Sequence, residues 1–331
     1  MNNVIVENIS KSYKKAGTSG NTPIDKIKNA RSRKKGLNAA SNEIKALDKV
    51  SFRVDSGELF GFIGPDGAGK TSLFRILVSL LLPDSGTATV CGFDVVKDFK
   101  KIRNIAGYMP GKFSLYQDLT VEENLTFFTT IFGTTIQKNY HLIKDIYCQI
   151  EPFKDRRAGA LSGGMKQKLA LSCAMIHKPE ILFLDEPTTG VDAVSRMEFW
   201  EMLHNLKKAG ITIIVSTPYM DEASLCDRVA LIQEGSILKI GTPEEIITDF
   251  QKPVFAIRSE NTHQLIRDLE KSPECESVYP FGQYLHFIPE NVNIVIDTLS
   301  KTIHESHPEA EVFQVKPDIE DCFINLMKEK K

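Results

Sequence analysis

The fold of this chain is decided by one octapeptide, Gly64-Pro65-Asp66-Gly67-Ala68-Gly69-Lys70-Thr71. An apolar, strand-like run (residues 59–63) precedes it, and a helix-like run (residues 72–82) follows it. The glycines allow consecutive backbone N–H groups to curl around phosphates, and the following helix adds its positive N-terminal end. Lys70 supplies a positive charge, and the Thr71 hydroxyl is a candidate Mg²⁺ ligand. The stretch therefore predicts a phosphate-binding loop, with these nucleotide contacts: Gly64, Asp66, Gly67, Ala68, Gly69, Lys70, Thr71 and Ser72.

A second apolar run, residues 181–187, ends in two carboxylates and a proline. It is typical of a buried parallel strand whose carboxyl end points acidic side chains toward a ligand. We expect Asp185 to hold Mg²⁺ together with Thr71, and Glu186 to polarise the attacking water as the catalytic residue. The alternative is a strand that simply ends in a solvated turn.

A third motif, Leu161-Ser162-Gly163-Gly164-Met165-Lys166-Gln167, lies between the first two. Ser162 is a candidate N-cap for the helical pattern that follows, and two glycines leave the backbone at that helix start accessible. Ser162, Gly163 and Gly164 therefore predict a second anion-ready helix start.

Together these motifs resemble the ATP-binding subunit of an ABC transporter, over about residues 1–245. Residues 161–167 are similar to the signature motif of that family, with Met165 where Gln is common. The resemblance implies ATP and Mg²⁺ as ligands, and a dimer in which each signature motif reaches the γ-phosphate held by the other subunit. It also implies that Tyr13 stacks on adenine and that residues 190–193 reach the dimer seam.

The fold that the resemblance implies is α/β, a P-loop NTPase of the ABC ATPase type. It combines a mixed core sheet, an antiparallel β subdomain and a helical subdomain. The helical subdomain opens near residue 118, with Thr120 as a candidate N-cap and Glu123 as its capping-box partner. The implied partners are integral membrane permease subunits and a second ABC ATPase subunit, which makes a homodimer or a heterodimer.

Two positions depart from the family pattern. Gly111 stands where the family usually has a Gln that bridges metal, water and the coupling surface, and Pro218 stands where it usually has a His near the γ-phosphate. Loss of one preorganised stabiliser typically costs about 10²–10³ in rate, so the two losses predict a site that binds nucleotide and hydrolyses it slowly. The alternative is that both are tolerated variants of an active ATPase.

The composition predicts a cytoplasmic location. The chain has 331 residues, 42% of them hydrophobic and with a formal net charge of −2, and its apolar runs are far shorter than the roughly 20 residues of a membrane-spanning helix. No signal peptide is apparent, so we expect a cytoplasmic protein, peripheral on the inner face of the cell membrane, without a nucleic-acid partner. The six cysteines show no metal-like spacing and are expected to be reduced.

Residues 15–44 carry many Lys and Arg and few apolar side chains. Such a segment buries too little surface to offset its ordering, so we interpret it as a flexible basic insertion. It is a candidate contact for anionic lipid headgroups or an acidic partner, and a solvated loop without a partner is the alternative.

The C-terminal part, residues 251–331, follows a Pro-containing boundary and is predicted to be a separate domain from residues 1–250. Its pattern of strands and helices is β-α-β-β-α-β with a final helix at 319–328, capped by Asp318, which is a ferredoxin-like α+β unit. It resembles the small accessory domain of drug-exporter-type ATPase subunits, with docking, regulation or dimer stabilisation as its candidate roles.

Three functions remain open from the sequence. The first is the subunit that energises an exporter of the ABC-2 or drug-exporter kind, and the second is a catalytically degenerate partner that lends its signature motif to an active neighbour. The third is a soluble ABC ATPase outside transport, although that class usually joins two nucleotide domains or inserts a coiled coil.

Overall fold

The computed structural model describes residues 2–14 and 43–329. By internal contacts the chain divides into two compact units, one of residues 1–219 and 230–238 and one of residues 220–229 and 239–331. The predicted domain division after residue 250 therefore stays a prediction. The basic insertion lies outside the described residues except at its end, where the second strand already begins at Glu43.

Two sheets lie in the first unit, apart from residues 228–229 and 239–241 of the larger one, which the division assigns to the second unit. One is antiparallel, in the order β2-β1-β4-β5, and the other has six strands in the order β10-β9-β3-β8-β7-β6, of which β3, β8, β7 and β6 are parallel neighbours. The antiparallel strands are β1 (Asn2–Lys14), β2 (Glu43–Asp55), β4 (Ser85–Val90) and β5 (Phe93–Asp94). Those of the larger sheet are β3 (Leu59–Ile63), β6 (Ala106–Met109), β7 (Ile181–Asp185), β8 (Thr212–Thr217), β9 (Arg228–Gln233) and β10 (Ser236–Gly241).

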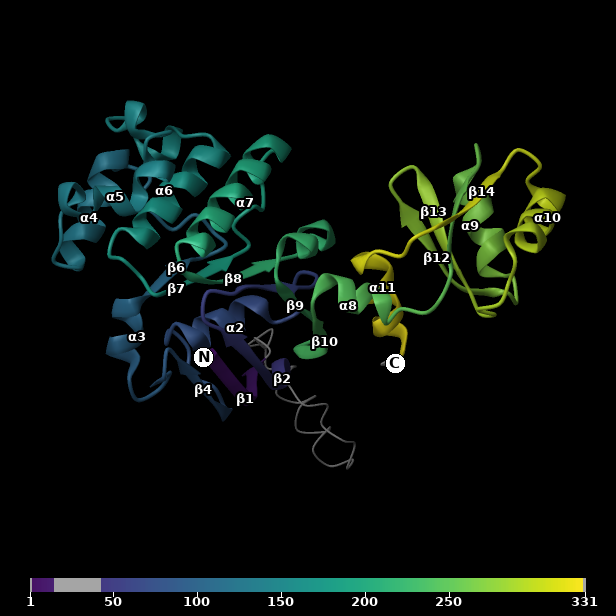
Figure 1. Cartoon of the computed structure of the whole chain (residues 1–331), viewed down its shortest axis with the longest axis horizontal. Coiled ribbons are helices and arrows are strands. Elements are labelled where there is room, and N and C mark those ends of the chain that lie inside the picture. The colour runs from purple at the N-terminus through teal and green to yellow at the C-terminus, as the bar shows by residue number, and fades with distance from the viewer. Residues whose placement is uncertain (1, 15–42, 330–331) are drawn as a thin grey trace, which may run out of the picture. The chain divides into compact units, whose positions relative to one another are not determined.

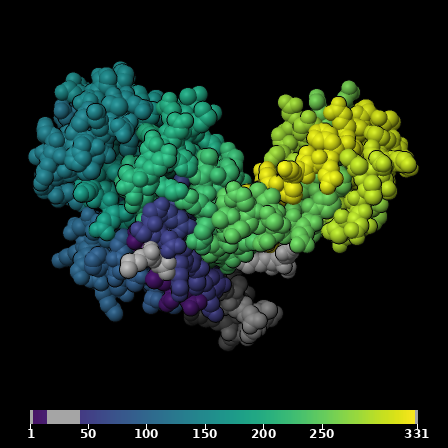
Figure 2. Space-filling model, in the orientation of Figure 1, coloured from purple at the N-terminus to yellow at the C-terminus, as the bar shows by residue number. Residues whose placement is uncertain are grey.

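Every residue of β3, β7 and β8 is buried, as expected for parallel strands covered on both faces. The helices of this unit are α2 (Lys70–Leu77), α3 (Phe99–Ile105), α4 (Val121–Ile131), α5 (Ile136–Tyr147), α6 (Gly163–Met175) and α7 (Ala193–Lys208). Figure 1 shows α4, α5 and α6 gathered into one helical group, and in the space-filling view this part forms a continuous teal surface (Figure 2).

The capping signals at the start of the helical group are confirmed. The Thr120 hydroxyl accepts a hydrogen bond from the Glu123 N–H, and the Glu123 carboxylate accepts one from the Thr120 N–H. The predicted end of α2 at residue 82 is wrong. Ser79 takes a left-handed conformation (φ +60°), and the Leu80 N–H donates to the Arg75 carbonyl over 2.7 Å, so the helix closes in a Schellman turn after Leu77.

The second unit contains an antiparallel sheet in the order β12-β13-β11-β14. Its elements are α8 (Pro243–Thr248), β11 (Val254–Arg258), α9 (Thr262–Glu270), β12 (Cys275–Phe281), β13 (Tyr284–Pro289), α10 (Ile296–Ser306), β14 (Glu311–Val315) and α11 (Ile319–Glu329). This is the predicted β-α-β-β-α-β order, with both outer strands next to the central pair. The α10 helix starts at Ile296, after a turn in which the Asn291 side chain accepts from the Asn293 N–H.

The α11 helix packs on the sheet through a buried polar network. His286 Nδ1 lies 2.7 Å from Asp321 Oδ1, and the Tyr279 hydroxyl donates to the same oxygen. Asp318 caps the helix, since its Oδ1 accepts from the Asp321 N–H over 3.0 Å. Burial alone would raise the pKa of Asp321, but hydrogen bonds from His286, Tyr279 and the Asp318 backbone hold it below its ordinary value.

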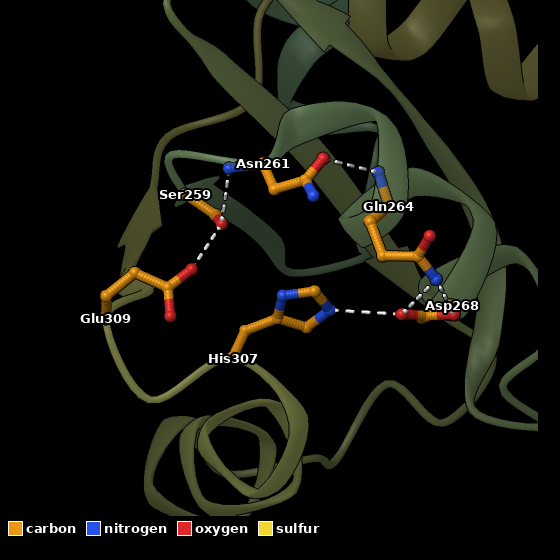
Figure 3. Close-up of polar contacts among 6 residues, drawn as sticks. All are labelled: Ser259, Asn261, Gln264, Asp268, His307 and Glu309. Carbon is orange, nitrogen blue, oxygen red and sulfur yellow. Dashed lines mark hydrogen bonds and ion pairs between the residues drawn. The ribbon is translucent and has the colours of Figure 1, made fainter.

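A second polar cluster joins the start of α9 to the turn between α10 and β14 (Figure 3). His307 Nε2 lies 3.2 Å from Asp268 Oδ2, whereas the Ser259 hydroxyl donates to Glu309 over 2.7 Å. The Ser259 hydroxyl therefore engages a carboxylate instead of the imidazole. We interpret this cluster as support for the two loops that it joins.

Candidate nucleotide-binding site

The phosphate-binding loop joins β3 to α2. Its positions require glycine for different physical reasons. A Cβ on Gly64 would lie 2.1 Å from the Ile232 carbonyl oxygen, so only glycine fits between the two strands. Gly67 (φ +80°) and Gly69 (φ +105°) take left-handed backbone conformations that other residues rarely adopt. The loop thus turns sharply, and α2 begins directly after it.

Lys70 is the first residue of α2, and its side chain is almost fully buried (3% exposed). Its ammonium donates to the Gly64 carbonyl over 2.7 Å and to the Pro65 carbonyl over 3.0 Å, and it lies 3.2 Å from Glu186 Oε1. A buried ammonium of this kind is stabilised only by such partners. The geometry therefore fixes a positive charge inside the loop and next to an acid.

A cavity of about 150 Å³ opens over the loop. Its lining comprises Ala46, Gly67, Ala68, Gly69, Lys70, Thr71, Ser72 and Glu186. The Tyr13 hydroxyl lies 3.1 Å from Ser72 Oγ, so the ring that the resemblance assigns to adenine stands beside the start of α2. Gly64 lies buried beneath the loop and Asp66 is exposed, and neither lines this cavity.

The two acids stand at the carboxyl end of β7, next to the loop. Asp185 is buried (1% exposed), and its Oδ1 accepts a hydrogen bond from the Ser216 hydroxyl over 2.7 Å. Glu186 leaves the strand with a left-handed backbone (φ +50°), and its side chain reaches the cavity and the Lys70 ammonium. Sequence reasoning had paired both acids with the loop; Glu186 contacts the loop through Lys70 and lines the cavity, whereas Asp185 does not line it.

Of the two positions that depart from the family pattern, Gly111 lies next to the acids. A Cβ on Gly111 would lie 3.1 Å from the Asp185 carbonyl oxygen and 3.6 Å from Glu186 Cβ. Pro218 directly follows β8, whose last residue, Thr217, accepts a hydrogen bond from the Gly64 N–H through its carbonyl. Gly111 therefore offers no side chain beside the acidic pair.

The signature motif lies apart from this cavity, at the start of α6. The Ser162 hydroxyl caps the helix by accepting from the Met165 N–H over 3.3 Å. A Cβ on Gly164 would lie 2.6 Å from Ser195 Oγ, and one on Gly163 would lie 3.2 Å from the Gly190 carbonyl oxygen. Small residues here thus allow the start of α6 to pack against the start of α7.

The start of α7 carries its own cap. Asp192 Oδ1 accepts from the Ser195 N–H over 3.0 Å, and this backbone hydrogen bond holds the pKa of the Asp192 carboxyl below its ordinary value. The carboxylate is therefore charged at neutral pH. Ser162, Gly163, Gly190 and Asp192 are exposed, and none of them lines the cavity.

Sequence reasoning missed two contributors to the site. Ala46 lines the cavity, and its carbonyl would lie 2.3 Å from a Cβ on Gly69, but nothing in its sequence marks it. Ser216 bonds Asp185, and the only signal for it was a hydroxyl at the end of an apolar strand.

The residues present fit a nucleoside triphosphate with Mg²⁺. A glycine loop at a helix start, a buried lysine, and Tyr13 beside the cavity residue Ser72 suit phosphates and a base. The Thr71 hydroxyl and the Asp185 carboxylate offer oxygen ligands, which Mg²⁺ prefers. Elsewhere in residues 2–14 and 43–329, no group of three or more His, Cys, Asp and Glu side chains forms a metal site. Fold and site together define a P-loop nucleotide-binding protein.

Comparisons with known proteins give the family. Residues 47–189 match the family model described as "ABC transporter". The chain is 34% identical over 298 residues to "Nod factor export ATP-binding protein I" of a Rhizobium strain, covering 88% of this chain and 95% of that protein. It is 37% identical over 300 residues to "Probable multidrug ABC transporter ATP-binding protein YbhF" of Escherichia coli, covering 88% of this chain. The chain therefore belongs to the ATP-binding proteins of ABC transporters.

The chain spans about half, 51%, of the length of the Escherichia coli relative. Solved structures agree on the fold. The cbiO1 protein from Clostridium perfringens superimposes with a TM-score of 0.59 at 22% identity, covering 81% of this chain and 94% of that one. A dimeric ATP-binding cassette in a post-hydrolysis state, bound to ADP and Pi, also gives a TM-score of 0.59 at 22% identity, covering 72% and 98%. Within the described part of the chain, no helix is both long and apolar enough to cross a membrane.

Proposed function

We propose that this chain is the ATP-binding subunit that energises an ABC-type exporter, with the membrane permease on separate subunits. The carrying observation is the buried Lys70 ammonium held between the loop carbonyls and Glu186, at a cavity bounded by the start of α2. Its relatives are named for export of Nod factor and for multidrug transport, which supports export as the direction. Its place would be the inner face of the cell membrane, bound to the permease.

In this proposal ATP binds over residues 64–72, with Tyr13 beside the base. Its phosphates would take the Lys70 ammonium from Glu186, and that exchange frees the carboxylate to face the attacking water. Mg²⁺, held by Thr71 and Asp185, would neutralise charge on the phosphate oxygens. The signature motif at Ser162, Gly163 and Gly164, of which the first two residues are exposed, would complete the site of a second ATPase subunit, since it does not line the cavity of its own chain.

Hydrolysis by this chain alone is expected to be slow. Gly111 offers no side chain beside the acidic pair, and Pro218 stands where the family pattern has a His. One missing stabiliser of developing charge costs about 10²–10³ in rate. The second candidate function, a degenerate subunit that supports an active partner, follows from the same observation. A soluble ATPase outside transport is the remaining alternative, and recovery as a lone protein from well-solubilised native membranes would favour it over export.

Thermal unfolding with Mg²⁺-ATP tests nucleotide binding. Ligand at about 100 times its dissociation constant stabilises a folded protein by about 2.7 kcal/mol, so the wild type should melt at a higher temperature with nucleotide. Lys70→Ala should lose that shift, because the charge at the phosphates is gone, while Lys144→Ala on the exposed face of α5 should keep it. An equal shift in wild type and Lys70→Ala would rule out this site.

In the second candidate function, the signature motif of this chain serves the site of its partner. A complex that contains an intact partner ATPase tests this role. Ser162→Arg should stop hydrolysis by that complex, because the motif would no longer approach the partner's nucleotide. Glu186→Gln should matter much less, since this chain's own site is the slow one. Stronger inhibition by Glu186→Gln than by Ser162→Arg would contradict the assignment.

A further inference from the structure

The Ser216 side chain is hydrogen-bonded to both acids, Asp185 and Glu186. It lies near the end of β8 and is fully buried (0% exposed). Its hydroxyl donates to Asp185 Oδ1 over 2.7 Å and accepts from the Glu186 N–H over 3.1 Å. One hydroxyl thus acts as donor to the first acid and as acceptor for the backbone of the second.

The parallel sheet puts the hydroxyl in this place. Ser216 is the direct cross-strand neighbour of Asp185, and the Ser216 carbonyl also accepts from the Glu186 N–H over 3.0 Å. The Glu186 amide is therefore shared between two oxygens of one residue. Glu186 holds a left-handed backbone that costs a non-glycine residue about 1–2 kcal/mol, and this double contact opposes its return to the strand conformation.

The neighbouring hydroxyl does something else. Thr217 is also fully buried, but its Oγ1 accepts from the Tyr219 N–H over 3.1 Å, in the turn after β8. Contact with the acids is therefore specific to Ser216 and is not a general property of buried hydroxyls in this strand. Thr217 offers a matched control.

We infer that Ser216 is a positioning residue that orients the Asp185 carboxylate for its metal and holds the turn that brings Glu186 to the cavity. The inference rests on the proposed function, because it assigns Mg²⁺ to Asp185. A hydrogen-bond partner that orients a metal-binding side chain typically contributes 10–100-fold to metal affinity or activity. In water-poor surroundings a carboxylate without that donor also loses a charge-assisted hydrogen bond.

The test compares ATP affinity in saturating Mg²⁺ with ATP affinity in EDTA, measured by anisotropy of a fluorescent ATP analogue. Ser216→Ala should weaken binding about tenfold in Mg²⁺ and leave it within twofold in EDTA. Ser216→Thr, which keeps the hydroxyl, should retain most of the Mg²⁺-dependent affinity. Thr217→Val, which removes the adjacent buried hydroxyl, should leave the ratio of the two affinities unchanged.

The outcomes separate this inference from the proposed function. Absence of ATP binding by the wild type in both conditions would overturn the proposed function. Binding by the wild type together with an unchanged ratio in Ser216→Ala would overturn only the role of Ser216. An equal loss in Mg²⁺ and in EDTA would also overturn it, because it would indicate general damage to the fold. Emission of the single tryptophan, Trp200, in urea checks that each variant is folded.

Discussion

The two left-handed glycines of the loop allow a matched experiment. Gly67 and Gly69 both have positive φ, but a Cβ on Gly67 meets nothing within 4 Å, whereas one on Gly69 would lie 2.3 Å from the Ala46 carbonyl oxygen. Gly67→Ala should therefore cost only the left-handed conformation, about 1–2 kcal/mol. Gly69→Ala adds a backbone clash at φ +105°, and such strained sites cost of the order of 1–3 kcal/mol more.

The assay is urea unfolding followed by tryptophan fluorescence. Trp200 is the only tryptophan of the chain and is buried in α7, so its signal reports on the first unit alone. Gly69→Ala should lower the free energy of unfolding more than Gly67→Ala does, by about 1–3 kcal/mol, and should weaken protection by Mg²⁺-ATP more. Equal losses in the two variants would refute the packing argument for the loop.

Three further predictions concern titration, thiols and the basic segment. Burial lowers the pKa of His177 to about 4, so between about pH 6.5 and 4 the unfolded chain binds a proton that the folded chain does not bind. The free energy of unfolding should therefore fall by at most about 3 kcal/mol as the pH drops through that window. A pH profile of stability that is unchanged in His177→Asn would contradict this. Exposed Cys148 should react with a thiol reagent at pH 8, and peptide mapping identifies the modified cysteine. Buried Cys173 and Cys322 should react only on unfolding, and burial also raises the pKa of Cys322 to about 12. Deleting residues 15–42 should leave folding intact and weaken binding to anionic vesicles most at low salt, and equal vesicle binding would make the segment a passive insertion.

The loop and the acids were predictable because their signals are local. Each glycine, Lys70 and the Asp185–Glu186 pair follows an apolar run at a fixed offset, and that run is the strand which positions them. The order of elements in the second unit was predictable for the same reason, since strands and helices alternate between short turns.

Contacts between distant segments were not predictable. The role of Ser216 depends on the register that places it opposite Asp185, 31 residues earlier in the chain. The close approach of Ala46 to Gly69 similarly joins β2 to the phosphate-binding loop. The early end of α2 depends on Ser79 taking a left-handed conformation, which serine seldom does and which no pattern in the sequence indicates.

The central claim is a nucleotide site that binds ATP but hydrolyses it slowly because polar side chains beside Glu186 are missing. The most direct measurement is single-turnover hydrolysis of Mg²⁺-ATP by the purified chain, by Pro218→His, and by each in the Glu186→Gln background. We expect tight binding with very slow turnover in the wild type, and turnover faster by about 10²-fold in Pro218→His that Glu186→Gln removes. Vigorous turnover by the wild type alone, abolished by Glu186→Gln, would contradict the claim and make this chain an ordinary symmetric ATPase.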